Sequence, residues 1–398
     1  MSFSQALSGL NAASSQLDVI GNNIANSQGV GFKGSRVLFS DIYAGAEAGL
    51  GARIAAVQQN FQNGALEGTG RNLDLAISGN GFFRFEQGGQ AVYSRNGQLS
   101  INSNGYLENA QGARLTGYPD GVGTGGDPQQ LRVPAGAMPA QATSSLQAAL
   151  NLDTGAPISA QPFDPSNSNS YAYANNVTVV DAQGTSHNLT LYFSKTAPNN
   201  WDVHLGIGGE VAAETGQLVF DDSGQLESAQ NLDSFVFNPA DQGGPLAEGV
   251  APLDMSLTLD ETTQFGSAFE LSSASQNGFE SGSLVSVSFD TEGNLIGNYS
   301  NQQTQVLGTV VLASFINEEG LEPLGDNIWG ETTESGSPLL GLASTGQFGS
   351  VEPSAVETSN VDLAQELVNL IIAQRNYQAN SQTIKVRDEV LQNAVNLR

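Results

Sequence analysis

The C-terminal stretch SNVDLAQELVNLIIAQRNYQANSQTIKVRDEVLQNAVNLR, residues 359–398, contains no glycine or proline and decides how the fold is organised. Its apolar residues recur at helical spacing, which predicts one long helix with an apolar stripe. The stripe consists of Leu363, Leu367, Leu370, Tyr377, Ile384, Leu391 and Val395, and Val361, Ala364, Val368 and Ile371 widen its first half. Ser359 or Asn360 is expected to cap the helix start, because either side chain can accept hydrogen bonds from free amides.

The first residues of the chain carry a second stripe, with apolar or small side chains alternately three and four positions apart. This is the spacing of a coiled-coil seam, formed here by Phe3, Ala6, Leu10, Ala13, Leu17, Ile20 and Ile24. Ser2 and Gln5 have capping-box spacing, so the helix is expected to start almost at the chain end. The two helices could pack together within one monomer or between copies, and we expect assembly between copies because neither stripe has a helical neighbour in the sequence.

The stretch GNNIANSQGVGFKG, residues 21–34, breaks the first helix into residues that favour turns. Asparagine and glycine adopt left-handed conformations readily, which predicts a helix end followed by a bendable connector. The candidate hinge residues are Asn22, Asn23, Asn26, Gly29, Gly31, Phe32 and Lys33. The asparagines are equally candidates for hydrogen bonds between neighbouring copies.

Between the two ends the sequence predicts β-structure. Runs such as GFFRF, NVTVVD, NLTLYF and LVSVSF are rich in β-branched and aromatic residues and are bounded by Gly, Asn, Asp and Pro. Three related segments, 101–109, 220–228 and 289–297, each predict a β-hairpin whose glycine supplies a positive φ. The expected fold class is therefore mainly β and multidomain, with a helix at each end of the chain.

The expected domain organisation has four parts, set by the helical ends and by clusters of proline and glycine. These parts are the helical ends (1–28 and 359–398), a connector (29–70), β-rich segments at 71–144 and 282–358, and a β-rich middle segment (145–281). We expect residues 71–358 alone to stay monomeric, whereas the full chain assembles.

The composition excludes several classes of partner and site. With 13 Lys+Arg against 40 Asp+Glu, the formal charge of -27 disfavours binding to nucleic acids and anionic membranes. The longest apolar run, 367–373, is too short to span a membrane. The absence of cysteine rules out disulfides and thiolate metal sites.

No set of residues typical of catalysis is present, so we expect no enzyme activity, no cofactor and no metal. His187 and His204 lie in strand-like sequence without further ligands at metal-binding spacing. The segments DDSGQLE (221–227) and DTEGNL (290–295) look like fragments of a calcium loop but lack its alternating ligands, so a hairpin turn is the better interpretation. A Ca²⁺-dependent surface adhesin is the alternative from another class, because it would share the acidity and the β content.

Both chain ends match a known pattern. The segment LSGLNAASSQLDVIGNNIANSQGVGFKGSR (7–36) resembles the N-terminal signature of the flagellar rod and hook axial proteins, in which a seam helix leads into N-N-I-A-N and then G-F-K. Residues 359–398 are similar to the paired C-terminal signature of that family. Residues 70–119 and 297–336 resemble the two halves of its β domain, and the long insertion between Pro139 and Ser281 favours hook subunits over the shorter distal rod subunits.

This resemblance implies a nested architecture, in which the terminal helices (1–28 with 359–398) form a coiled-coil-like inner assembly layer, 71–144 with 282–358 form a discontinuous inner β domain, and 145–281 is an outer β domain inserted into it. It also implies an extracellular structural subunit of the bacterial flagellum. Copies would polymerise into a short, curved, hollow hook that works as a universal joint between motor and filament. The implied partners are other copies, rod subunits, hook-associated proteins, the hook cap and the flagellar type III export apparatus. A distal rod or hook-associated subunit is the alternative within the same class.

Overall fold

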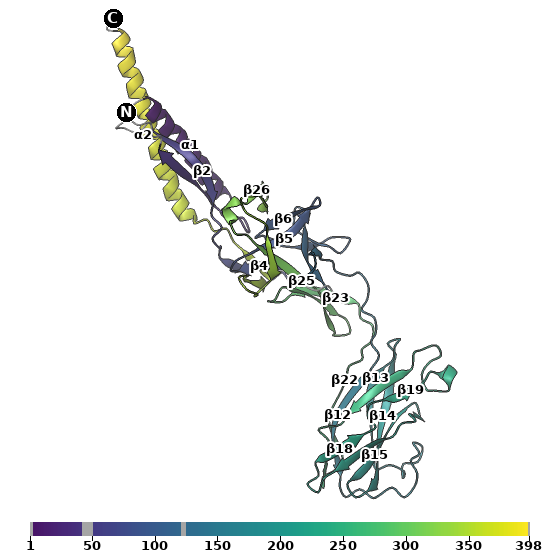
Figure 1. The fold of residues 1–398 in the computed structure, drawn as a ribbon. Coiled ribbons are helices and arrows are strands. Elements are labelled where there is room, and N and C mark those ends of the chain that lie inside the picture. Colours follow the sequence, from purple (N-terminus) through teal and green to yellow (C-terminus); the bar gives the residue numbers. More distant parts are fainter. Residues whose placement is uncertain (1–2, 42–50, 121–124, 397–398) are drawn as a thin grey trace. The chain divides into compact units, whose positions relative to one another are not determined.

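The computed structural model describes residues 3–41, 51–120 and 125–396, which form two long helices and many short strands (Figure 1). The expectation of a mainly β chain with helices at both ends is confirmed. The chain separates into two compact units. Unit 1 comprises 1–135, 286–298 and 304–398, and unit 2 comprises 136–285 and 299–303. Unit 1 therefore joins the helical ends to a discontinuous β core, and the finer predicted boundaries stay a prediction.

Unit 1 begins and ends with its helices, α1 (Phe3–Ala25) and α2 (Leu363–Asn396). Its strands before the insertion are β1 (Ser35–Asp41), β2 (Ala52–Gln59), β3 (Leu66–Gly68), β4 (Asp74–Ser78), β5 (Phe82–Gln87), β6 (Gln90–Ser94), β7 (Gly97–Gln98), β8 (Ser100–Ile101), β9 (Leu107–Glu108), β10 (Arg114–Pro119) and β11 (Gln129–Gln130). The strands after it are β23 (Leu284–Phe289), β24 (Asn294–Tyr299), β25 (Thr304–Ser314), β26 (Glu322–Gly325), β27 (Ile328–Gly330), β28 (Leu339–Leu342), β29 (Ser350–Pro353) and β30 (Ala355–Glu357), with a 3₁₀ turn, η2 (Glu318–Gly320).

The main sheet of unit 1 interleaves strands from both sides of the insertion, in the order β23-β24-β25-β10-β5-β6-β27-β26. An aromatic cluster packs beside it, formed by Phe82, Tyr93, Phe315 and Trp329 together with Phe61 from the segment before β3. The Phe61 ring meets Phe82 and Trp329 edge-on, at centroid distances of 5.7 and 5.5 Å. The segment expected to be only a connector is thus part of this core, and a fragment 71–358 would lack that aromatic contact.

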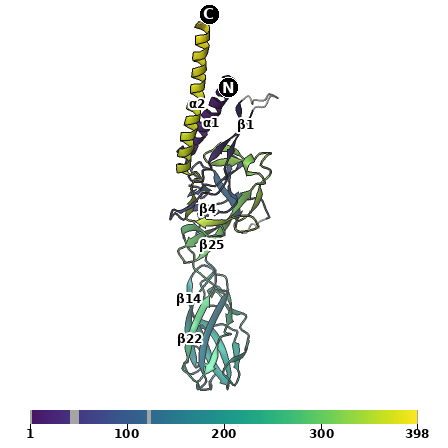
Figure 2. The same ribbon diagram turned by 90° about the vertical axis from the view of Figure 1, so that its left-hand side faces the viewer.

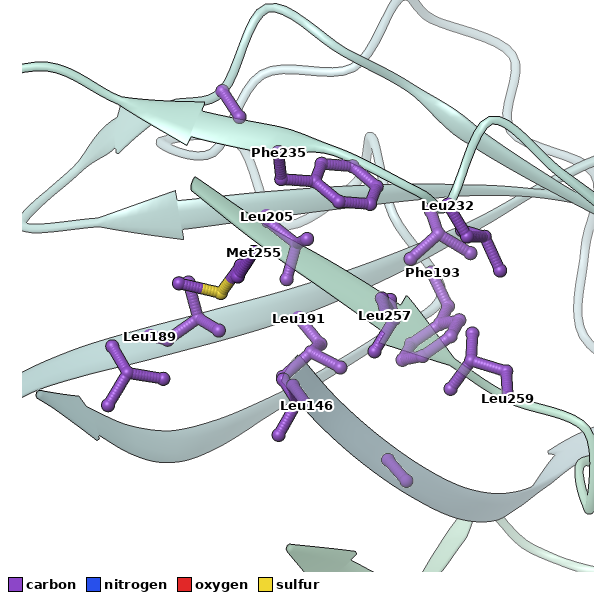
Figure 3. Packing of buried hydrophobic residues seen from close by; sticks show 14 of the residues in the cluster. Leu146, Leu189, Leu191, Phe193, Leu205, Leu232, Phe235, Met255, Leu257 and Leu259 are labelled. Atoms are coloured by element: carbon purple, nitrogen blue, oxygen red, sulfur yellow. The ribbon is translucent and has the colours of Figure 1, made fainter. Parts of the chain in front are cut away.

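Unit 2 contains two sheets. Its strands are β12 (Ser145–Asp153), β13 (Tyr173–Val180), β14 (Ser186–Ala197), β15 (Asn200–Ile207), β16 (Glu210–Val211), β17 (Gly216–Phe220), β18 (Leu226–Gln230), β19 (Phe235–Phe237), β20 (Leu253–Thr258), β21 (Thr263–Phe265) and β22 (Glu270–Gln276), with a 3₁₀ turn, η1 (Ala240–Gln242). One sheet has the order β13-β14-β15-β17-β18, and the other has the order β19-β20-β12-β21. Leucine, phenylalanine and methionine side chains from both sheets form one buried cluster (Figure 3).

The three predicted hairpin turns are confirmed, with φ of 84° at Gly105, 79° at Gly224 and 80° at Gly293. Each turn begins with an Asn or Asp whose Oδ1 accepts hydrogen bonds from the amides two and four residues later; these residues are Asn102, Asp221 and Asp290. The carboxylates of the suspected calcium fragments therefore fix turns in the main chain.

The two histidines of unit 2 occupy different environments. His187 pairs with the buried carboxylate of Asp181 at 2.8 Å. The His204 ring lies flat on Phe163, with centroids 3.9 Å apart and planes 4° apart. Burial lowers the pKa of His204 below its ordinary value of 6.5. The folded protein therefore favours the neutral imidazole.

Acidification is expected to destabilise unit 2 through His204. Because its folded pKa lies below 6.5, the unfolded chain takes up a proton at higher pH than the folded chain does. The contribution of His204 to the unfolding free energy is thus complete above pH 6.5 and is lost as the pH falls through the folded pKa. Urea titrations at successive pH values should show this loss as a falling free energy of unfolding, and His204→Gln should make that free energy depend less on pH. An unchanged pH dependence in that variant would contradict the assignment.

Candidate assembly surface and attachment of the helices

The helices α1 and α2 lie side by side and run antiparallel (Figures 1 and 2). Asn23 near the end of α1 reaches Glu366 near the start of α2, whereas Gly9 near the start of α1 lies against Asn380. A Cβ at Gly9 would lie 2.9 Å from the Asn380 amide, so glycine permits this close approach. The face of α2 toward α1 includes Ala373, which is fully buried.

The start of α2 differs from the prediction. The residue that caps it is Asp362, whose Oδ1 accepts hydrogen bonds from the amides of Ala364 and Gln365 at 2.9 and 3.1 Å. The prediction that Ser359 or Asn360 caps the helix is wrong, because the side chain of Asn360 is used elsewhere. It accepts a hydrogen bond from the Gly34 amide and donates to the carbonyls of residues 60 and 62. The predicted capping residue Ser2 lies outside the described residues.

A second face of α2, away from α1, is apolar and exposed. Its large side chains are each about half exposed: Leu367 46%, Val368 51%, Ile371 50%, Ile372 50%, Val386 48% and Val390 59%. Ala373, one position after Ile372, is 0% exposed because it faces α1. A helix that is apolar on opposite faces is normally covered on both sides. Within the described part of this chain, α1 covers only one of them.

The predicted stripe on α2 turns gradually around the helix. Leu363 and Leu367 are exposed, Tyr377 is 37% exposed, and Leu370 and Ile384 are half-buried. This drift has a simple cause, because a repeat of seven residues lags the true helical period by about 20° per heptad in a straight helix. On α1, Ile20 is buried and Leu10, Leu17 and Ile24 are half-buried. The side chains of Phe3, Leu391 and Val395 lie outside the described residues.

The connector contains a hairpin that the sequence did not predict. Strands β1 and β2 pair antiparallel and contact α1. Four large apolar side chains of this hairpin stay exposed: Leu38, Phe39, Ile54 and Val57. A two-stranded hairpin is only marginally stable by itself in water, so this hairpin depends on its packing against α1.

The predicted hinge stretch lies where the helix pair joins the β core, and α1 ends within it at Ala25. Asn23 is buried and its side chain exchanges two hydrogen bonds with the main chain of Ser35, at 2.8 and 2.9 Å. Asn26 instead bonds back to Asn22 within the last helical turn. Gly31 has a φ of +68°, and a Cβ there would lie 2.6 Å from a main-chain nitrogen of the β core. Phe32 is half-buried beside Gly29, which accepts its amide hydrogen bond.

Lys33 at the end of this stretch belongs to a buried ionic cluster. Its Nζ lies 2.6 Å from Oε1 of Glu357, and Nη1 of Arg95 lies 3.2 Å from the other carboxylate oxygen. Burial lowers the pKa of Lys33 and of Arg95, and the nearby Glu357 carboxylate opposes both shifts. The sequence identified Lys33 through its G-F-K motif, but nothing in the sequence singled out Glu357 or Arg95.

Residues 3–41, 51–120 and 125–396 contain no group of three or more His, Asp or Glu side chains that could hold a metal ion. Within the same ranges no helix combines the length and the apolar character needed to cross a membrane. The features that stand out are therefore the uncovered apolar face of α2 and the cluster beneath the helix pair.

Four family models match the chain in order along the sequence. They are flagella basal body rod protein at 4–33, flagellar hook protein FlgE/F/G D1 domain at 76–147, flagellar basal body protein FlaE D2 domain at 150–279, and flagellar basal body rod FlgEFG protein C-terminal at 352–397. The chain is 45% identical over 410 residues to the flagellar hook protein FlgE of Escherichia coli K12, covering 100% of both chains. It is 30% identical to that of Borreliella burgdorferi, covering 98% of each.

A solved structure shares the fold. The crystal structure of Helicobacter pylori flagellar hook protein FlgE2 matches with a TM-score of 0.51 at 14% identity, covering 73% of this chain and 100% of that one. The family models and the full-length relatives place a chain of this fold among the axial proteins of the flagellum. The chain belongs to the flagellar hook protein FlgE family.

Proposed function

We propose that copies of this chain polymerise into the flagellar hook, a curved hollow tube that passes torque from motor to filament while it bends. The observation that supports this is the second apolar face of α2, which its own chain leaves uncovered. Burial of apolar surface contributes about 25 cal/mol per Å² and recurs in every subunit of a polymer. Cohesion would then come from helices of many copies packed as an inner layer.

Compliance would come from the outer β domains. Their surfaces are polar and acidic, and Lys195, the one Lys or Arg of residues 145–281, is buried, so contacts between copies would be hydrogen bonds, each with a net contribution of about 0.5–1.5 kcal/mol. Contacts of that kind, bridged by water, can re-form as subunits slide past each other during bending. The domain organisation that goes with this proposal is the predicted one, with an outer domain at 145–281 inserted into an inner β domain, 71–144 with 282–358.

The proposed partners follow from the position of a hook in the flagellum. They are rod subunits at one end, hook-associated proteins at the other, and the hook cap and the flagellar type III export apparatus during assembly. The proposed role is mechanical rather than enzymatic, and it places the protein outside the cell at the flagellar basal body. Electron microscopy of the assembled chain tests this proposal, since a hook subunit gives curved hollow tubes and a distal rod subunit gives straight ones.

We retain the stretch 21–34 as a proposed hinge, in which bending falls on the residues before Gly31 because Gly31 and Lys33 are held against the β core. We expect Gly29→Ala with Gly31→Ala to impair assembly or bending. Gly31 is the more sensitive position, because alanine there would need a strained φ and would clash with the β core. Gly29→Ala alone is the matched control, since a Cβ at Gly29 would approach its neighbours only to 3.2 Å. Swimming assays and microscopy of tubes would check this. Normal motility of the double variant would make the stretch an ordinary helix end.

A further inference from the structure

The buried ionic cluster joins four segments that are far apart in the sequence. Glu357 in β30 accepts hydrogen bonds from Nζ of Lys33 at 2.6 Å, from the amide of Gly64 at 2.7 Å and from Nη1 of Arg95 at 3.2 Å. Lys33 also donates to the carbonyl of Gln62 at 2.7 Å. One carboxylate therefore holds the chain leaving α1, the segment before β3 and a loop of the β core at a single point.

The same point fixes the chain as it returns to α2. The amide of Gly31 donates to the carbonyl of Glu357 at 2.7 Å, and the amide of Gly34 donates to Oδ1 of Asn360 at 2.9 Å. The segment that leaves α1 and the segment that returns to α2 are thus held to each other. Arg95, which pairs with Glu357, is itself fixed because its Nη2 donates to the carbonyl of Gly79 at 2.9 Å. Within the described residues, the segments around 31–34, 60–64 and 357–360, which link the helices and the β1–β2 hairpin to the β core, meet at this point.

The three charged side chains are only 0–2% exposed, so their placement is specific. A buried ion pair adds little net stability, because desolvation offsets the attraction, but loss of one partner leaves an uncompensated buried charge. A shift of any one of the connecting segments would therefore leave one of these buried charges without its partner.

We propose that Glu357 is a positioning residue that locks both ends of the chain onto the β core, so that force on the terminal helices reaches the strands of unit 1. This inference rests on the proposed mechanical function. Through the Glu357 cluster the helix pair and the β core are held together as one mechanical unit. This role of the cluster is separate from assembly, because the proposed contact surface between copies is the uncovered face of α2, which contains none of the cluster residues.

Hydrogen exchange on the full-length chain, kept unassembled at low concentration, tests this lock. Glu357→Gln keeps the shape and removes the charge, and it should speed exchange at Gly31, Gly34 and Gly64 by more than about 100-fold. Exchange in β5 and β25 should stay unchanged. Glu352→Gln, a half-exposed glutamate in the neighbouring β29, is the matched control and should leave all these amides as they are.

Lys33→Met separates the two sides of the lock, because Glu357 keeps its pair with Arg95 in that variant. Gly31 and Gly34 should lose protection, and the amide of Gly64, which donates to the carboxylate, should keep it. Unchanged exchange at these glycines in both variants, or faster exchange spread through the β core, would overturn the proposal. Failure of the wild-type chain to form tubes would count against the proposed function and leave the exchange result standing.

Discussion

Replacing Leu367 and Ile371 together by glutamate is expected to abolish assembly of the full chain while leaving the monomer folded. Both side chains lie on the face of α2 that α1 does not cover and are about half exposed. Full burial of such a side chain contributes about 1.5–3 kcal/mol, and burial of an unpaired carboxylate is far more costly than that. The critical concentration for assembly should therefore rise by more than about 100-fold.

Two further variants make this result specific. Leu367→Met with Ile371→Val keeps the same face apolar and should assemble at nearly the wild-type concentration. Ala373→Glu places the charge on the opposite face, where Ala373 is fully buried against α1, and should disrupt the helix pair in the monomer. Light scattering gives the critical concentration, and circular dichroism of the unassembled chain reports the helices. Normal assembly of the double glutamate variant would show that this face is not the contact surface.

Phe82→Ala is expected to destabilise unit 1 alone, by about 3–5 kcal/mol. Phe82 is fully buried and forms edge-on ring contacts with Phe61, Phe315 and Trp329. Its removal leaves a cavity at the point where the connector joins the β core. Because the chain forms two compact units with separate cores, calorimetry should show one transition falling by about 10 °C and the other unchanged.

Trp201→Ala is the reciprocal variant and should lower only the transition of unit 2, by a similar amount. Trp201 is fully buried in the core cluster of unit 2, and its Nε1 donates to Oε1 of Gln264 at 2.7 Å, a bond that alanine cannot make. Phe265→Ala, a 43% exposed phenylalanine of the same unit, is the control and should change little. A joint shift of both transitions in either core variant would mean that the units unfold together.

Local patterns were predictable from the sequence where the cause is local. The long helices follow from apolar spacing, and the turns at Gly105, Gly224 and Gly293 follow from an Asn or Asp three positions before a glycine. The class of protein was also recognisable, because the family signatures lie in continuous segments at the chain ends. In each case the residues that decide the structure are neighbours in the sequence.

Features that depend on distant partners were not predictable. Glu357 and Lys33 are 324 positions apart, and a glutamate in a short strand carries no sign that it will be buried beside a lysine. The β1–β2 hairpin was missed because its apolar residues do not alternate strictly, so its strands lack a clear period of two. On α2 the stripe was found, but which of its residues stay exposed, such as Leu367, depends on the face of the helix that α1 covers.

The most direct test of the central claim, that the terminal helices assemble this chain into a hook, is electron microscopy of the purified full-length protein above its critical concentration. We expect hollow tubes with regular curvature, formed by the wild-type chain and absent for Leu367→Glu with Ile371→Glu at the same concentration. Straight tubes would contradict the hook assignment. Tubes that form equally well from the double glutamate variant would contradict the role of the uncovered face of α2.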